Sequence, residues 1–378
     1  MHSPDDYWDL KKVIVSVTND LSTDQRVDRV CNTLTSMGFS VVLVGRSLPD
    51  SLPLHREYKT RRMKLMFRKG PLFYAEYNIR LLFFLVFHQA DLLVSNDLDT
   101  LTANYVAHKL KSIPIVYDSH EYYTGTPELI NRPRVQGIWK FIERSIFPKL
   151  SDIFTVNESI AALYNQEYHK HLHVLRNIPK KLTKRPTLNS GDLGFDSKKH
   201  LIILQGAGIN IQRGAEEAIL AMKFVENTIL LIIGSGDVID SLKEMVKTNN
   251  LTEKVEFFPK KPYSELINYT SAAEIGLTLD KDTNINYRFS LPNKLFDYIH
   301  AGTPVLASPL PEIRKIIDKY KVGITIESHN PEHIASKINY MLENDFKTKL
   351  KENLEVAANE LNWENEEKIL KQVYLKYV

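Results

Sequence analysis

The chain has a single cysteine among its 378 residues, Cys31. One thiol cannot build an internal disulfide framework, and it cannot supply the several thiolates of a cysteine-based zinc cluster. Such scarcity is typical of a protein from a reducing compartment. We therefore expect a cytoplasmic protein.

Long apolar runs and an excess of one charge are also lacking. The longest apolar run, residues 81–87, is far shorter than the roughly 20 residues of a transmembrane helix. Residues 1–10 hold three acidic side chains and lack the apolar core of a secretory signal. The net charge is only +3, so no global positive field favours nucleic acid.

The length and the apolar pattern predict two α/β domains, because one domain usually holds about 100–200 residues. Apolar runs without polar alternation are typical of parallel strands covered on both faces by helices. The predicted strands are 13–17, 41–44, 91–95, 113–117, 153–156, 200–204, 229–233, 255–258, 275–279 and 305–307. Residues 176–199 form the predicted linker. Ligands bind beyond the carboxyl ends of parallel strands, so residues that follow strands are the candidates for chemistry.

The most informative stretch is LPNKLFDYIHAGTPV, residues 291–305. Pro292 suits the first turn of a helix and Gly302 suits its end. Lys294 and Asp297 are three residues apart, so they share a helix face near the N-terminus, where backbone N–H groups favour an anion. The lysine can bind a diphosphate, and the carboxylate can accept hydrogen bonds from ribose hydroxyls. A surface helix with an i,i+3 ion pair explains the spacing equally well.

A second candidate is the turn QGAGINIQRG, residues 205–214, between a predicted strand and a helix. Gly206 and Gly208 allow close approach of a ligand to the backbone. Arg213 stands at the helix entrance, where its charge fits a phosphate oxygen. The dinucleotide fingerprint is broken, since Ile211 replaces the third glycine. An ordinary tight turn is the alternative interpretation.

These segments resemble the GT-B glycosyltransferases of family four, a large bacterial group that builds surface polysaccharides. Residues 292–305 resemble the donor-binding helix of the family, and 206–214 resemble the segment that carries a basic pair for the diphosphate. The resemblance implies two Rossmann-like domains whose parallel sheets face a central cleft. The acceptor-side domain would comprise residues 1–178 with a returning helix at 362–378, and the donor domain would comprise residues 179–361.

The resemblance implies a nucleotide-diphosphate sugar of UDP or GDP type as donor, with no metal and no further cofactor. Asp297 matches the acid that holds the ribose, and Arg213 matches the second residue of the basic pair. The first basic position has no match, and Lys294 supplies the missing charge. The first acid of the family motif falls at Phe289, with Asp280 and Asp282 as nearby substitutes. The implied donor-binding residues are Gly206, Gly208, Arg213, Asn293, Lys294 and Asp297.

In the first half, His120 follows a predicted strand within DSHE and matches the histidine that the family places near the donor sugar. A purely structural histidine is the alternative. The predicted acceptor or cleft residues are Asn19, Asp20, Asp97 and Glu121. Helix capping is the alternative interpretation for Thr23, Asp24 and Asp97.

The resemblance therefore implies a retaining, metal-independent glycosyltransferase of hexosyl or acetylhexosaminyl type that uses His120, Arg213 and Lys294. The cations would stabilise the leaving group, and the leaving phosphate would help to remove the acceptor proton. The acceptor would be a glycan or a lipid-linked glycan. A sugar-nucleotide epimerase of the same fold and a non-catalytic nucleotide-sugar-binding protein remain alternatives. The broken glycine pattern leaves a nicotinamide dehydrogenase as a distant alternative.

Residues 59–87 are first basic and then aromatic and aliphatic. The basic side chains could meet anionic lipid headgroups on the inner face of the cell membrane, while Phe67, Leu72, Phe73 and Tyr74 could enter the interface. The alternative is that residues 77–87 form a buried helix of the first domain.

Overall fold

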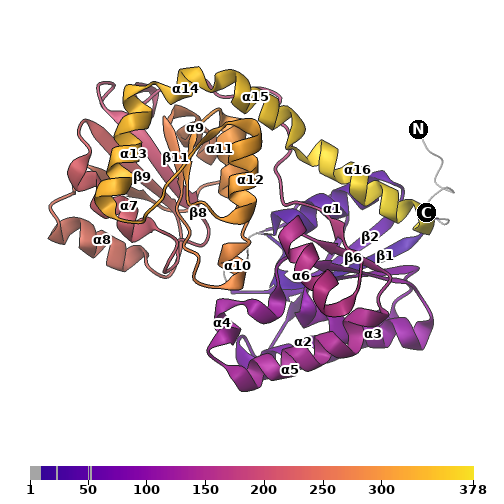
Figure 1. Cartoon of the computed structure of the whole chain (residues 1–378). Helices are drawn as coiled ribbons and strands as arrows, with labels where there is room; N and C mark the ends of the chain where they lie inside the picture. The colour runs from indigo at the N-terminus through magenta and orange to yellow at the C-terminus, as the bar shows by residue number, and fades with distance from the viewer. Residues whose placement is uncertain (1–9, 23, 50, 52) are drawn as a thin grey trace. The chain divides into compact units, whose positions relative to one another are not determined.

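The computed structural model of the chain describes residues 10–22, 24–49, 51 and 53–378 (Figure 1). The chain forms two compact units, Met1–Asn177 with Glu366–Val378 and Ile178–Asn365. Each unit contains one parallel β-sheet covered by helices, so the predicted α/β class with two Rossmann-like domains is confirmed. The predicted capping role of Thr23 lies outside the described residues.

The first unit is built on a seven-stranded parallel sheet in the order β3-β2-β1-β4-β5-β6-β7. Its strands are β1 (Lys12–Asp20), β2 (Ser40–Ser47), β3 (Lys59–Lys64), β4 (Leu92–Asn96), β5 (Ile115–Ser119), β6 (Asp152–Thr155) and β7 (His173–Val174). Its helices are α1 (Gln25–Ser36), α2 (Gly70–Phe87), α3 (Leu98–Lys111), α4 (Pro127–Ile130), α5 (Pro133–Ile146) and α6 (Glu158–Tyr168), with most of α16 (Trp363–Tyr374).

The order of this sheet reverses between β1 and β4, which makes their carboxyl ends the expected ligand site. Strand β1 is apolar because helices cover both of its faces: Val13, Ile14 and Val15 are at most 1% exposed. Helix α1 begins after Asp24, whose side chain accepts a hydrogen bond from the Val27 N–H at 3.1 Å, as the sequence predicts.

The second unit is built on a six-stranded parallel sheet in the order β10-β9-β8-β11-β12-β13, with its reversal between β8 and β11. Its strands are β8 (His200–Gly206), β9 (Thr228–Gly234), β10 (Val255–Phe258), β11 (Ile275–Thr278), β12 (Val305–Ala307) and β13 (Gly323–Thr325). Its helices are α7 (Ala215–Ala221), α8 (Ile239–Thr248), α9 (Tyr263–Ala272), α10 (Ile285–Arg288), α11 (Asn293–Ala301), α12 (Pro311–Tyr320), α13 (Pro331–Glu343), α14 (Phe346–Lys349) and α15 (Lys351–Glu360).

Three strands were not predicted, and each lacks the buried apolar run on which the prediction depends. Strand β3 lies at the sheet edge, and four of its six residues are charged. Strands β7 and β13 have only two and three residues. The predicted linker, 176–199, contains no β-strand and no α-helix, and the second unit begins within it at Ile178.

Candidate functional site

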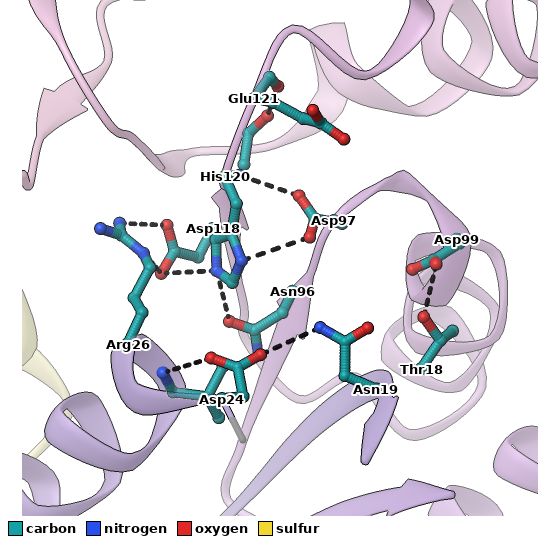
Figure 2. A network of polar contacts seen from close by, with 12 residues as sticks. Thr18, Asn19, Asp24, Arg26, Asn96, Asp97, Asp99, Asp118, His120 and Glu121 are labelled. Carbon is teal, nitrogen blue, oxygen red and sulfur yellow. Dashed lines mark hydrogen bonds and ion pairs between the residues drawn. The ribbon is translucent and has the colours of Figure 1, made fainter. Parts of the chain in front are cut away.

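His120 is the centre of a polar network at the carboxyl ends of β1, β4 and β5 (Figure 2). Its backbone N–H donates to Asp97 Oδ1 at 2.8 Å, and its Nδ1 lies 3.3 Å from Asp97 Oδ2. Its Nε2 lies 3.5 Å from Asp118 Oδ2 and 3.2 Å from Asn96 Oδ1. Two strand ends therefore hold both ring nitrogens against acceptors.

Asp118 is in turn held from below by Arg26 of α1. The guanidinium donates from Nη2 to Oδ1 at 2.7 Å and from Nε to Oδ2 at 3.1 Å, and both residues are 3% exposed. Burial raises the pKa of Asp118, but Arg26 and His120 outweigh burial and lower that pKa well below its ordinary range. The carboxylate is thus a fixed negative charge beneath the imidazole.

The two carboxylates determine the charge of His120. Burial lowers the pKa of the imidazole, but Asp97 and Asp118 outweigh this effect and raise the pKa to about 9. A protonated imidazole donates from both nitrogens and has no lone pair to accept a proton. The protonated imidazole directs its two N–H groups to Asp97, Asp118 and Asn96, so His120 places a fixed positive charge at this site.

Asp97 has a strained backbone, with φ 57° and ψ 166°. It stands at the N-cap position of α3, yet its side chain makes no capping hydrogen bond, because the carboxylate turns toward His120. The capping interpretation is therefore wrong for Asp97. Strain of this kind concentrates at functional sites, where neighbouring groups hold the residue in place.

The other predicted residues of this unit differ in whether their side chains are held by neighbouring residues. Asn19 donates to Asp24 at 3.1 Å, so this amide is oriented by the residue that caps α1. Asp20 accepts hydrogen bonds within its own loop and lies 3.5 Å from Arg62, so its carboxylate supports the loop. Glu121 follows His120 directly and is exposed.

In the second unit, Arg213 and Lys294 meet on one buried carboxylate. Arg213 Nη1 lies 3.2 Å from Asp280 Oδ1, and Lys294 Nζ lies 3.5 Å from Asp280 Oδ2. Asp280 is fully buried just after β11, whereas the side chains of Arg213 and Lys294 are 28% and 10% exposed. The Arg213 guanidinium also lies over the Tyr287 ring, 4.6 Å from its centroid. Two cations are thereby fixed at one place.

Helix α11 begins beside this pair at the exposed residue Asn293. Its N-cap residue, Pro292, gives no side-chain capping bond, so the helix end can serve an anion. One turn later, Asp297 accepts from Gln205 Nε2 at 3.2 Å. Gln205 is the penultimate residue of β8 and is itself oriented by Thr270, which donates to its Oε1 at 2.6 Å. The Asp297 carboxylate is therefore aimed by the end of a strand.

The glycine turn after β8 leaves open space beside its backbone. A Cβ added to Gly208 or Gly206 would meet no atom nearer than 3.9 Å and 3.8 Å respectively. In contrast, a Cβ at Gly214 would lie 2.3 Å from the Leu279 carbonyl oxygen. Packing therefore requires glycine at 214, whereas the first two glycines keep the backbone accessible to a ligand.

Neither neighbouring aspartate is an open replacement for the acid missing at Phe289. Asp280 is occupied by the two cations, and no part of its side chain is exposed. Asp282 is exposed and lies 3.9 Å from Arg288. Phe289 itself follows α10, and the Arg288 guanidinium lies 5.9 Å from its ring centroid. The structure thus gives Asp280 a supporting position behind the cations.

Sequence reasoning missed the groups that orient the site, above all Arg26, Asn96 and Gln205. One signal was present, because Asp118 lies near the end of a buried strand and a buried carboxylate needs a cation. The partner could not be chosen from sequence, since Arg26 lies 92 residues away.

Two protein-family models match the chain. The model of glycosyl transferases group 1 matches residues 189–360, and that of glycosyltransferase family 4 matches residues 24–178. Each match thus covers most of one unit. No curated protein sequence matches the chain significantly.

Similar solved structures extend over nearly the whole chain. Sucrose-phosphate synthase from Thermosynechococcus elongatus is 15% identical, with a TM-score of 0.81 over 97% of this chain and 98% of that chain. HepE from Anabaena in complex with UDP-glucose is 12% identical, with a TM-score of 0.73 over 96% and 99%. WaaG, a glycosyltransferase involved in lipopolysaccharide biosynthesis, is 15% identical, with a TM-score of 0.71 over 96% and 99%. The fold is therefore GT-B, and the two family matches support a glycosyltransferase.

Proposed function

We propose that this GT-B glycosyltransferase transfers a sugar from a nucleotide-diphosphate sugar to a hydroxyl acceptor with retention of the anomeric configuration. The observation that carries the proposal is the convergence of Arg213 and Lys294 on Asp280, beside the uncapped start of α11. A paired cation site next to a helix N-terminus fits a diphosphate.

The donor would lie across the carboxyl ends of β8 and β11. Arg213, Lys294 and the N–H groups at Asn293 would bind the diphosphate, and Asp297 would accept hydrogen bonds from the ribose. The open backbone at Gly206 and Gly208 would admit the phosphates. Negative charge on the leaving diphosphate grows in the transition state, so fixed cations accelerate transfer without a metal. The complex of the structural neighbour HepE with UDP-glucose supports a donor of UDP type, with GDP as the other candidate.

His120 would serve this reaction as a fixed positive charge held by Asp97 and Asp118. Its protonation leaves no lone pair for the acceptor proton, so that proton must leave by another route. We propose that it passes to the leaving phosphate on the same face of the sugar. This path needs no protein nucleophile and retains the anomeric configuration.

The acceptor would be a glycan or a lipid-linked glycan in surface polysaccharide biosynthesis on the cytoplasmic side of the membrane. The likeness to WaaG, whose structure is described as that of a lipopolysaccharide glycosyltransferase, supports this setting. Asn19, Asp97 and Glu121 are the candidate acceptor contacts, while Asp20 would act by supporting the loop. The sugar would be a hexose or an acetylhexosamine.

The test begins with a thermal-shift screen of UDP- and GDP-sugars, because a bound donor raises the melting temperature. The selected donor is incubated with glycan and lipid-linked acceptors, and the products are analysed by mass spectrometry and NMR. We expect free nucleoside diphosphate and a transferred sugar with its configuration retained, undiminished in excess EDTA. The Arg213→Ala/Lys294→Ala double variant should give neither product.

The other outcomes of this experiment are distinct. An isomerised nucleotide sugar without transfer would identify an epimerase, and donor binding without any product would identify a binding protein. Inversion of the configuration would refute the same-face path. Loss of activity in EDTA, restored by manganese, would refute the metal-independent mechanism.

A further inference from the structure

Helix α2 exposes large apolar side chains along its outer face. Ile79, Phe83 and Phe87 follow one another at four-residue spacing and are 57%, 60% and 77% exposed. The opposite face packs into the first unit through Phe73, Tyr77, Leu81 and Leu85. A surface helix normally presents polar side chains to water, so this exposed stripe indicates an interaction surface.

The neighbouring helices continue the same surface. Helices α2, α3 and α5 lie beside one another in one layer on one side of the sheet (Figure 1). The rings of Tyr74 and Trp139, with centroids 5.1 Å apart, join α2 to α5. Leu110 of α3 is 68% exposed, and Ile138 and Phe141 of α5 are 62% and 72% exposed. We call the six residues Ile79, Phe83, Phe87, Leu110, Ile138 and Phe141 the outer apolar face.

The accessible charge on these three helices is almost entirely positive. Their acidic residues are Glu76, which pairs with Arg80 at 2.8 Å, and the buried residues Asp99 and Glu143. Their basic residues are at least partly exposed: Arg80, Lys109, Lys111, Arg134, Lys140 and Arg144. An apolar stripe among cations complements a surface whose interior is apolar and whose headgroups are anionic.

We infer that the outer apolar face docks on an anionic lipid surface. The aromatic and aliphatic side chains would enter the boundary between headgroups and acyl chains, and the surrounding cations would contact the headgroups. Within the described part of the chain, no helix is long and apolar enough to cross a membrane, so this contact is peripheral. A second copy docked through the same face in a twofold dimer would bring like cations together, which disfavours that occupant.

The surface differs from the one that the sequence indicates. Of the four predicted residues, Phe67 and Leu72 are 41% and 58% exposed, whereas Phe73 is only 5% exposed and Tyr74 packs on Trp139. The buried-helix alternative holds for one face of α2 only. Arg62 belongs to the edge strand β3, where it lies 3.5 Å from Asp20.

The experiment is co-sedimentation of the full chain with phosphatidylcholine vesicles that contain or lack phosphatidylglycerol. No donor is present, so the result does not depend on sugar transfer. We expect binding to anionic vesicles that falls as salt rises. The triple variant Phe83→Ser/Phe87→Ser/Phe141→Ser should lose affinity by about tenfold or more, because three apolar insertions are removed. The variant Arg134→Ser/Lys140→Ser should bind anionic vesicles more weakly and show a smaller salt effect.

The matched control removes exposed apolar side chains elsewhere. Val356 and Leu375 are 54% and 64% exposed on other helices, and Val356→Ser/Leu375→Ser should bind as the wild type does. Melting temperatures check the fold, and the single variant Phe87→Ser replaces the triple variant if that one fails to fold. Wild-type binding by the Phe variants, or equal binding to neutral and anionic vesicles, overturns the inference. So does a wild-type dimer in light scattering that the triple variant converts to monomer.

Discussion

Replacement of Lys294 by methionine tests the donor site with little disturbance of the fold. Methionine keeps much of the apolar stem of lysine and removes only the charged end. Lys294 is 10% exposed and lies 3.5 Å from Asp280, but Arg213 holds the other oxygen of that carboxylate at 3.2 Å. Because Asp280 stays paired, we expect Lys294→Met to cost less than the roughly 3–5 kcal/mol of a fully broken buried pair.

The effect on the donor should be larger than the effect on the fold. A charge-assisted hydrogen bond to the diphosphate contributes about 1.5–3 kcal/mol, so its loss should weaken nucleoside diphosphate binding roughly tenfold to a hundredfold. The value of kcat should fall as well, because the lost charge faces a leaving group whose negative charge grows in the transition state. Lys294→Met should therefore lower both kcat and affinity.

Calorimetry with UDP or GDP measures the dissociation constant, and the melting temperature reports the fold. Lys281→Met is the matched control, since Lys281 lies on the same loop as Asp280 but pairs with Glu217. It should bind nucleotide as the wild type does. A folded Lys294→Met variant with wild-type affinity and kcat would refute the assignment of this helix to the donor. Equal weakening of nucleotide binding by both variants would show that the net positive charge of this region, rather than a specific contact of Lys294, determines the affinity.

Two further predictions concern the carboxylates behind the cations. Asp280→Asn should lower the melting temperature, because Arg213 and Lys294 lose their shared counter-charge. Bound nucleoside diphosphate should then raise the melting temperature of the variant by more than it raises that of the wild type. An equal ligand-induced rise in both proteins contradicts this role of Asp280. His120 should titrate by NMR with a pKa of about 9, and Asp97→Asn should lower that pKa. The pKa of His120 in the folded protein lies above the ordinary value of about 6.5. The contribution of His120 to stability is therefore complete below pH 6.5 and is lost as the pH rises through about 9. A measured pKa near 6.5 in the wild type refutes the charge assignment.

The sequence predicts the central strands because burial on both faces imposes apolar runs. Residues 305–307 form the interior strand β12 with the predicted bounds, and residues 255–258 form the edge strand β10, whose bounds its apolar run also predicts. The same reasoning does not predict strand β3, because an edge strand of charged residues has the composition of a loop. Helix α2 shows a further limit. It is apolar on nearly all sides, so no periodicity tells which face is buried, and only the packing on α3 and the sheet decides.

The candidate site was predictable where a residue type and a position after a strand coincide. Lys294 and Asp297 follow from their shared helix face, and His120 follows from its place after β5. The orientation of side chains was not predictable. Asp97 occupies a capping position, yet its backbone at φ 57° turns the carboxylate to His120 instead. Asp280 is an acid near the expected position of the sugar-binding acid, but its contact with Arg213, 67 residues away, makes it a buried counter-charge for the cations instead.

Both units place a buried carboxylate against two cationic side chains at the ends of their strands. In the first, buried Asp118 contacts both Arg26 and His120; in the second, buried Asp280 contacts both Arg213 and Lys294. Two cations close together repel each other and spread apart unless an anion lies between them. A shared carboxylate holds the cations in position and cancels part of their charge, and in the proposed donor site this would moderate ground-state binding. Under the proposed function, the orientation of Arg213 and Lys294 would stay available for a leaving diphosphate whose charge increases during the reaction, and this preorganisation would favour the transition state over the bound donor.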